Sequence, residues 1–395
     1  MMTITGPSQE SGKTIDPIDK CPSVLLDGML VHTAALGAGR STTLFPGQAL
    51  LVDGPTSGRV AFAHGIPQQT QLSMATFVQD KRVRRALLEQ NRFPVPKGAT
   101  FSVGRGGADA RAFAERLGYP VSVKPMVGDS TIENFPRVAD PDELASAFEY
   151  FRTAPQYREA YESASYAFTA IHTPQEGTTA TKRSYRLLIE ENVSGEYLRF
   201  VVIGDEIASA VSLPEGLDLP SAGSEVLHAT DPTVRRFVSE IAEVFSGLTL
   251  VVIDLVLSVG HDSPIEDQNA YVVEIAERPW LHVQRSVSAA SALQLGGRIL
   301  AAGESTGTTT APDADSRMSA AVQWQGVTVM ERFIHQMRTA AEVLDAEVTV
   351  ETKDPVGGVA AGHISGSPAT IALLNETAVA GHFDGERIMA VRTTQ

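Results

Sequence analysis

The sequence predicts an α+β protein with more than one domain. The chain is 395 residues long, which exceeds one ordinary hydrophobic core. Strand-like apolar runs are interspersed with segments whose apolar residues recur at helical spacing. The last 78 residues have the order strand, helix, strand, strand, helix, strand. That order is typical of a small ferredoxin-like sandwich.

Composition narrows the class of protein. Hydrophobic residues are 43% of the chain and charged residues 20%, as in soluble globular proteins. No run is long and apolar enough to span a bilayer. Residues 1–20 lack an apolar signal core, so we expect them to be a mobile tail and the protein to be cytoplasmic. The formal net charge of −15 argues against a sequence-wide nucleic-acid surface, and the single cysteine, Cys21, excludes internal disulfides and thiolate metal cages.

The first half of the chain contains signals for both strands and helices. Several glycines are spaced along residues 24–66, and this pattern predicts short strands and turns there. A helix begins near Lys81 and stops before Pro94, because proline blocks further helix. Asp140 is expected to cap a later helix that has proline at its first position. The remaining elements expected in this half are a strand over 99–103, a helix over 108–117 that Gly118 closes, and a strand over 120–125.

The second half is richer in strands. Residues 171–184 are expected to form a polar surface loop, and Gly204-Asp205 a hairpin turn between two strands. Apolar residues at 234, 237, 238, 241, 244 and 245 form one helical face. Two further strands, 248–259 and 271–276, precede a helix that runs to residue 303. Residues 303–317 have the composition of a linker.

Two carboxylates stand within apolar strands. Asp254 interrupts LTLVVIDLVLSV, and Glu274 lies inside YVVEIAERPWL. An unpaired buried carboxylate is costly, so each acid either meets an arginine or caps a turn, or both face one point. In the last case they would supply the hard oxygen ligands that Mg²⁺ prefers. Glu277 and Arg278 come just after this strand, where its end would open onto a site.

Two other features carry candidate chemistry. Lys124 ends the apolar strand PVSVKP, where it either extends along apolar surface to water or aims a point charge at a polyphosphate. GRGGAD, residues 104–109, is either a dinucleotide loop or a turn that starts a helix. The turn is favoured, because the next strand ends in lysine and proline rather than in the acid that a dinucleotide fold needs.

Four segments together resemble ATP-grasp enzymes, most closely the ATP-grasp part of cyanophycin synthetase and bifunctional glutathione synthetase. They are, in order, QDKRVRRALLEQNRFPVPKG, LGYPVSVKP, LLIEENVSGEYLRFVVIGDEI, and LVVIDLVL with YVVEIAERPWL. The resemblance covers roughly residues 70–302, and residues 24–69 weakly. It implies two α+β lobes that grip ATP. It also implies attack of a carboxylate on the γ-phosphate to give an acyl phosphate, which an amine then displaces.

The resemblance assigns roles residue by residue. Lys81 and Lys124 would contact the ATP phosphates. The hinge from Glu190 and Glu191 to Val193 would hold adenine. Arg199 and Arg278 would face the acyl phosphate or the substrate carboxylate. The Mg²⁺ ligands would be Asp254, Glu274 and Glu277.

Departures from the family pattern concern the nucleotide site and the acceptor. Ala276 stands where the family usually has asparagine, which leaves Glu277 as a substitute ligand. Trp280 replaces a glycine, and Ser212 an expected arginine. The acid expected at Tyr197 is instead the neighbouring Glu196. The loop 128–134 keeps one glycine, and Ser130 and Thr131 are its candidate hydrogen-bond donors.

The expected activity is an ADP-forming carboxylate–amine ligase that makes an amide or peptide bond from small-molecule substrates, in specialised metabolism. The alternative is a nucleotide- or partner-binding protein with degraded catalysis. Related enzymes are usually dimers, so a homodimer is compatible with this resemblance. The last module resembles acylphosphatase through VQWQGV, but Met330 and Thr352 replace the catalytic arginine and asparagine, so it is expected to be inactive. The expected division is a tail (1–20), a pre-ATP-grasp region (21–78), an ATP-grasp domain (79–302), a linker (303–317) and a ferredoxin-like module (318–395).

Overall fold

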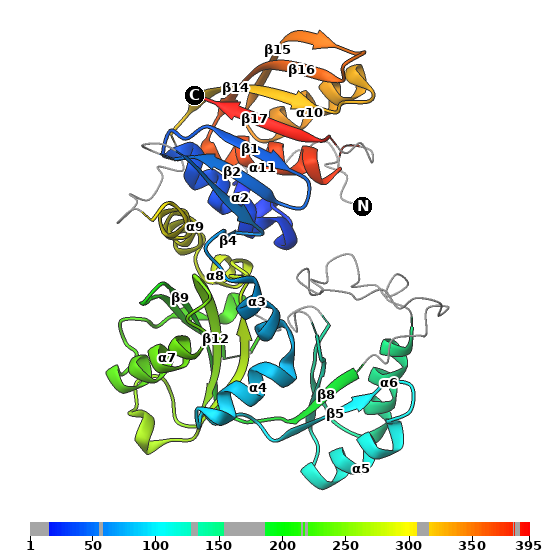
Figure 1. The fold of residues 1–395 in the computed structure, drawn as a ribbon, viewed down its shortest axis with the longest axis vertical. Coiled ribbons are helices and arrows are strands. Elements are labelled where there is room, and N and C mark those ends of the chain that lie inside the picture. Colours follow the sequence, from blue (N-terminus) through cyan, green and yellow to red (C-terminus); the bar gives the residue numbers. More distant parts are fainter. Residues whose placement is uncertain are drawn as a thin grey trace. The chain divides into compact units, whose positions relative to one another are not determined.

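The computed structural model describes residues 16–54, 58–127, 133–153, 186–214, 216–217, 220–305, 316–381, 383 and 388–395. The chain divides into two compact units, coloured along the sequence in Figure 1. Unit 2 is the central stretch Thr70–Glu277, and unit 1 combines the chain up to Gln69 with the chain from Arg278 onward. None of the helices in the described part has the length and apolar character that a bilayer crossing needs.

One sheet of unit 2 has five strands in the order β11-β10-β9-β12-β13, all antiparallel. Its strands are β9 (Glu196–Ile203), β10 (Glu206–Ser212), β11 (Ser224–Glu225), β12 (Leu250–Leu257) and β13 (Ala270–Ala276). The helices of this part are α3 (Leu72–Gln79), α4 (Lys81–Gln90) and α7 (Pro232–Val244), with two short 3₁₀ turns, η2 (Pro220–Ala222) and η3 (Ile265–Asp267). One face of the sheet packs its apolar side chains, such as Phe200 and Ile253, against Val238 and Ile241 of α7. The opposite face is therefore available for polar side chains.

The other sheet of unit 2 has four strands in the order β5-β8-β6-β7, again antiparallel. They are β5 (Gly98–Ser102), β6 (Val121–Pro125), β7 (Phe135–Val138) and β8 (Arg186–Glu191). The helices α5 (Gly107–Leu117) and α6 (Pro141–Arg152) share a core with it. Asp140 caps α6 by accepting hydrogen bonds from the N–H groups of Asp142 and Glu143, as the sequence predicts. GRGGAD forms the turn that leads into α5.

Unit 1 contains one sheet of eight strands in the order β15-β16-β14-β17-β1-β2-β3-β4. The strands are β1 (Thr42–Phe45), β2 (Ala49–Asp53), β3 (Arg59–Ala63), β4 (Ile66–Pro67), β14 (Met318–Gln325), β15 (Glu347–Asp354), β16 (Val359–Gly366) and β17 (Ala390–Thr394). The helices are α1 (Pro17–Lys20), α2 (Ser23–Gly37), α8 (His282–Val287), α9 (Ala289–Glu304), α10 (Met330–Val343) and α11 (Pro368–Ala380). The order β15-β16-β14-β17, with α10 and α11 between the strands, is the ferredoxin-like arrangement. The α+β fold class is confirmed.

One expectation for the secondary structure of unit 1 is corrected. Residues 24–37 do not form strands and turns, because Ser23–Gly37 is a helix. This helix packs against both α9 and α11. It is therefore buried on all sides and shows no amphipathic period. Its Gly28 is not a turn residue: a Cβ there would lie 2.7 Å from Oε1 of Gln48.

The expected division into separate N-terminal and C-terminal domains does not coincide with the two units. Strand β1 pairs with β17, with Thr43 opposite Arg392, and α2 packs against α11. The two ends of the chain thus share one sheet and one core. Within the expected tail, Pro17–Lys20 is helical and capped by Asp16, and α9 continues to Glu304 at the start of the expected linker. The polar loop 171–184 and most of the linker lie outside the described residues.

Candidate functional site

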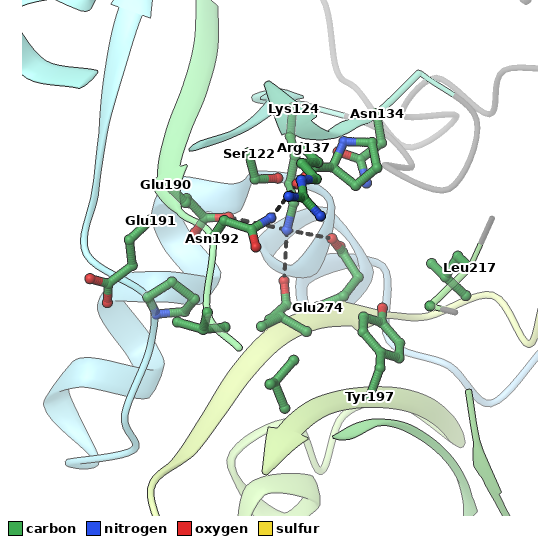
Figure 2. A pocket seen from close by; sticks show the side chains of 16 residues that line it. Ser122, Lys124, Asn134, Arg137, Glu190, Glu191, Asn192, Tyr197, Leu217 and Glu274 are labelled. Carbon is green, nitrogen blue, oxygen red and sulfur yellow. Dashed lines mark hydrogen bonds and ion pairs between the residues drawn. The ribbon is translucent and has the colours of Figure 1, made fainter. Parts of the chain in front are cut away.

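Unit 2 contains a cavity of about 260 Å³ that residues of both of its sheets line. Figure 2 shows the side chains that surround it. The connection between β8 and β9 contributes Asn192 and Val193, so the cavity lies where the chain passes from one sheet to the other. The other lining residues include Ser122, Lys124, Asn134, Arg137, Glu190, Glu191, Tyr197, Leu217, Val273 and Glu274.

Lys124 holds its ammonium group inside this cavity. All five residues of β6 are buried, and the lysine side chain is only 9% exposed. Its Nζ donates to the carbonyl oxygen of Val273 at 3.0 Å and lies 3.1 Å from Oε2 of Glu190. It also lies 3.9 Å from Oε2 of Glu274, and Figure 2 shows it between the two carboxylates. One cation therefore joins acceptors of the two sheets.

The hinge residues lie along one wall. Glu190, at the end of β8, pairs with Arg85 of α4 as well as with Lys124. Glu191 accepts a hydrogen bond from the N–H of Lys97 at 2.9 Å. Asn192 donates to the carbonyl oxygen of Pro136 at 2.6 Å. These bonds fix the backbone that leads into Val193, which also lines the cavity.

A row of three charged residues crosses the neighbouring sheet. Asp254 lies opposite Arg199 of β9 in one direction and opposite Glu274 of β13 in the other. Directly opposite residues of antiparallel strands share a face, so the row lies on the face away from α7. Arg199 binds both oxygens of Asp254, at 2.8 and 2.7 Å, and the Tyr197 hydroxyl donates to Oδ2 at 2.6 Å. The fully buried Asp254 thus meets an arginine, one of the alternatives that the sequence leaves open.

Glu274 is surrounded by cations. It pairs with Arg84 of α4 and is close to Lys124. Burial alone would raise the pKa of this carboxyl, but the positive charges of Arg84, Lys81 and Lys124 outweigh burial and lower its pKa to about 2. The carboxylate therefore stays ionised inside an apolar strand because protein cations compensate it.

Helix α4 carries three of the cations of this region. Asp80 caps the helix, and the N–H of Lys81 donates to the carbonyl oxygen of Met126, just after β6. Lys81 is completely buried, and the side chains of Arg84 and Arg85 are 6% and 15% exposed. Residues three and four positions apart lie on one face of a helix. The helix therefore presents all three to the acids of the two sheets.

Two predicted acids have partners away from the cavity. Glu196 accepts hydrogen bonds from Ser212, from the N–H of His261 at 2.7 Å and from its ring. Burial would raise the pKa of Glu196, but these hydrogen bonds lower it. Glu277 accepts a hydrogen bond from Gln79 at 2.7 Å. Neither acid is among the residues that line the cavity.

Arg278 belongs to unit 1. Its Nε donates to Oδ2 of Asp27 at 2.7 Å, and its guanidinium lies 4.0 Å from the ring centre of Trp280. Asp27 is completely buried in α2. This arginine therefore links the N-terminal segment of unit 1 to the segment that begins at residue 278. Ser130 and Thr131 lie outside the described residues.

Arg84, Arg85, Arg137 and Asn134 are residues of the site that the sequence reasoning missed. A signal for the first two was present in KRVRR, where Lys81, Arg84 and Arg85 have helical spacing. Arg137 and Asn134 line the cavity from β7 and the turn before it. No local pattern distinguishes them from other polar residues at a strand edge.

The donor set does not fit a protein-held Mg²⁺. Asp254 already accepts three hydrogen bonds, and Glu274 has the positive charges of Arg84, Lys81 and Lys124 beside it. Ala276 supplies no side-chain oxygen. Across the described ranges, no three His, Cys, Asp or Glu side chains gather closely enough to hold a metal ion. The acids expected to bind Mg²⁺ are thus engaged with groups of the protein itself.

Neither a family model nor a curated protein matches the chain. Among solved structures, it is similar to D-alanine–D-alanine ligase from Bacillus anthracis complexed with ATP, at 16% identity and a TM-score of 0.39 over 58% of this chain and 64% of that one. It is also similar to a RimK domain ATP-grasp protein from Sphaerobacter thermophilus, at 15% identity and a TM-score of 0.38 over 58% and 68%. A third is a bifunctional glutathione synthetase from Pasteurella multocida, at 12% identity and a TM-score of 0.33 over 59% and 37%. The chain spans less than two thirds of the first and third of these proteins. The resemblance to ATP-grasp ligases, stated from the sequence, is found again among these structures.

Proposed function

We propose that this protein is an ATP-dependent carboxylate–amine ligase whose nucleotide site is the cavity of unit 2. The observation that carries the proposal is the position of Lys124, whose ammonium group is held inside the cavity by acceptors from both sheets. A cavity that Lys124 and Arg137 line together with a polar backbone hinge suits a ligand with a polyphosphate at one end and a base at the other.

Different residues of the cavity contact different parts of the nucleotide. Lys124 is the donor for the phosphates. Lys81 is completely buried and is not a lining residue, so it contributes its positive charge beside Glu274. The backbone from Glu190 to Val193 is the wall for the base, because its strand end and connection line the cavity beside the ordered Glu191 and Asn192. Arg137 and Asn134 line it as well and add polar contacts to this end. Arg199, which binds both oxygens of Asp254, acts as a positioning residue that holds the charged side chains on this face of the sheet in place.

The proposed reaction has two steps. A carboxylate oxygen of the acid attacks the γ-phosphorus, the bond from phosphorus to the bridging oxygen breaks, and ADP leaves. The amine nitrogen then attacks the acyl carbon, phosphate leaves, and the nitrogen loses a proton. Both steps move negative charge among phosphate oxygens, so fixed cations and correct positioning are the main contributions that the protein supplies.

The test is an ADP-release assay with ATP, MgCl₂ and the twenty amino acids supplied in pairs, extended to other small acids and amines. The proposal predicts ADP release that requires one acid together with one amine, and an amide product of the summed mass minus water. Lys124→Met is the matched variant, which is expected to lose this release. Release of ADP without any dependence on an acid would contradict the ligase assignment.

A second candidate is a nucleotide-binding protein without turnover. The occupied carboxylate of Asp254 and the missing side-chain oxygen at Ala276 favour it. It predicts that ATP stabilises the protein against heat, while no combination of acid and amine releases ADP.

A further inference from the structure

Arg84 places a positive charge directly beside the buried carboxylate of Glu274. Its guanidinium pairs with the Glu274 carboxylate and donates to the carbonyl oxygen of Ile275 at 2.8 Å. Both side chains of the pair are nearly buried, at 6% and 7% exposed. The arginine therefore contacts the side-chain carboxylate of Glu274 and the backbone carbonyl of the next residue of β13, Ile275, which precedes Ala276.

The charges around the cavity sum to a positive value. The charged lining residues and the three cations of α4 beside them are counted together. They give five positive and three negative charges, a net charge of +2: Lys81, Arg84, Arg85, Lys124 and Arg137 against Glu190, Glu191 and Glu274. Arg199 and Asp254 cancel one another in a separate pair. A site of this sign attracts an anion directly. A divalent cation placed beside Glu274 would instead meet the positive charges that already surround it.

We infer that Arg84 replaces a divalent cation as the counter-charge of Glu274, so that the cavity binds the triphosphate of a nucleotide without requiring a metal ion. This inference rests on the proposed function and concerns binding, the first event in it. It assigns Arg84 as a positioning residue, which keeps the Glu274 carboxylate from repelling the phosphates.

The test is isothermal titration of the full chain with ATP, in EDTA and again in excess MgCl₂. We expect dissociation constants within about threefold of each other, because the cations of the site are covalently part of the protein. For Arg84→Gln, which leaves Glu274 uncompensated by the guanidinium, we expect binding in EDTA to weaken about tenfold or more. MgCl₂ should recover part of that loss.

Two further variants control for general effects. Arg84→Lys keeps the charge and should retain most of the binding in EDTA. Arg82→Gln removes an arginine of the same helix whose side chain is 52% exposed and pairs with the nearby Asp80, and it should bind ATP as the wild type does. If Arg84→Gln fails to fold, the wild-type comparison between EDTA and MgCl₂ still decides.

The outcomes separate the two proposals. Wild-type protein that binds ATP only with MgCl₂ would overturn this inference and leave the proposed function standing. Wild-type protein that binds ATP in neither buffer would overturn both. Equal weakening of Arg84→Gln in both buffers would show that Arg84 does not act as the replacement for a metal ion.

Discussion

At the scale of single residues, the site is explained by how buried carboxylates are compensated. Asp254 is matched by Arg199 and Tyr197, and Glu274 by Arg84 with two lysines nearby. A buried ion pair adds little net stability, but removing one partner leaves the other charge unpaired. Substitutions in this network should therefore cost more than their contact areas suggest.

Glu274→Gln is expected to destabilise the protein by about 3 kcal/mol, because it leaves Arg84 without its carboxylate in a buried environment. Denaturant unfolding followed by circular dichroism measures this change. Glu89→Gln is the matched control: its side chain is 59% exposed and pairs with Arg85 across one helical turn, so a change below about 0.5 kcal/mol is expected. Equal effects of the two substitutions would refute the buried network.

A second residue-scale prediction concerns Glu376 of α11. This acid is completely buried, and neither of its oxygens has a hydrogen-bond partner within the described part of the chain. Burial raises its pKa from 4.5 to about 8. Between these values the folded protein keeps a proton that the unfolded chain has released, so stability falls as the pH rises from about 4.5 towards 8.

Glu376→Met removes the titrating group and conserves volume. At pH 7 it should raise the free energy of unfolding by about 3 kcal/mol, and the gain should shrink towards pH 5. Unfolding curves of both proteins from pH 5 to pH 8 measure it. A difference that stays constant with pH would show that Glu376 is not protonated in the folded state.

The sequence predicts part of the site because some residue types are conspicuous in their surroundings. Lys124, Asp254 and Glu274 are single charges in apolar strands, and all three belong to the charged cluster beside the cavity. The partner of Glu274 could not be predicted, because Arg84 reaches it only through the packing of α4 against a strand far along the chain. The position of Arg278 could not be predicted for a related reason. Its partner is the buried Asp27, which lies in helix α2, and this helix was not expected from the sequence.

At the scale of elements, the strongest disagreement concerns α2. Amphipathic segments such as α4 and α7 were predicted correctly because one face of each is polar. Helix α2 has no solvent-exposed polar face, since α9 and α11 pack against it, and its glycines resemble turn signals. Periodicity cannot distinguish a fully buried helix from a series of short strands.

Helix α9 packs against α2 at a distance that a glycine permits. A Cβ at Gly296 would lie 2.7 Å from the carbonyl oxygen of Leu30, so Gly296→Ala should force the helices apart and cost about 2 kcal/mol. Gly107→Ala is the matched control in α5, where the nearest atom would be 3.8 Å away, and it should stabilise the helix by about 0.5 kcal/mol. Thermal unfolding of both variants provides the comparison. A neutral Gly296→Ala would contradict the close approach of the two helices.

At the scale of the whole molecule, the two compact units do not follow the order of the sequence, because unit 1 combines the chain up to Gln69 with the chain from Arg278 onward. The ferredoxin-like order at the C-terminus could be predicted because each of its elements has a clear period. The pairing of its edge strand β17 with β1 could not be predicted, because pairing between segments far apart in the chain leaves no local signal in the sequence. Unit 1 is thus closed by both ends of the chain, and unit 2 is a single continuous stretch.

A fragment of residues 70–277 is therefore expected to fold and unfold cooperatively, because both of its sheets and their cores lie within it. Removal of residues 318–395 should prevent unit 1 from folding, since β1 would lose β17 and α2 would lose α11. Thermal unfolding and limited proteolysis of the two fragments measure this. A truncated chain with an intact, protected N-terminal region would contradict the shared core.

The central claim is that the cavity of unit 2 binds ATP through Lys124, and titration calorimetry of ATP with wild-type protein and Lys124→Met tests it most directly. The variant should keep its fold, because Arg85 and Arg84 still compensate Glu190 and Glu274. Lys353→Met is the control, as this lysine pairs with Glu331 on the surface of unit 1. Saturable binding in the wild type and control, weakened about tenfold or more in Lys124→Met, is the predicted result. Unchanged affinity in Lys124→Met, or no binding by the wild type, would contradict it.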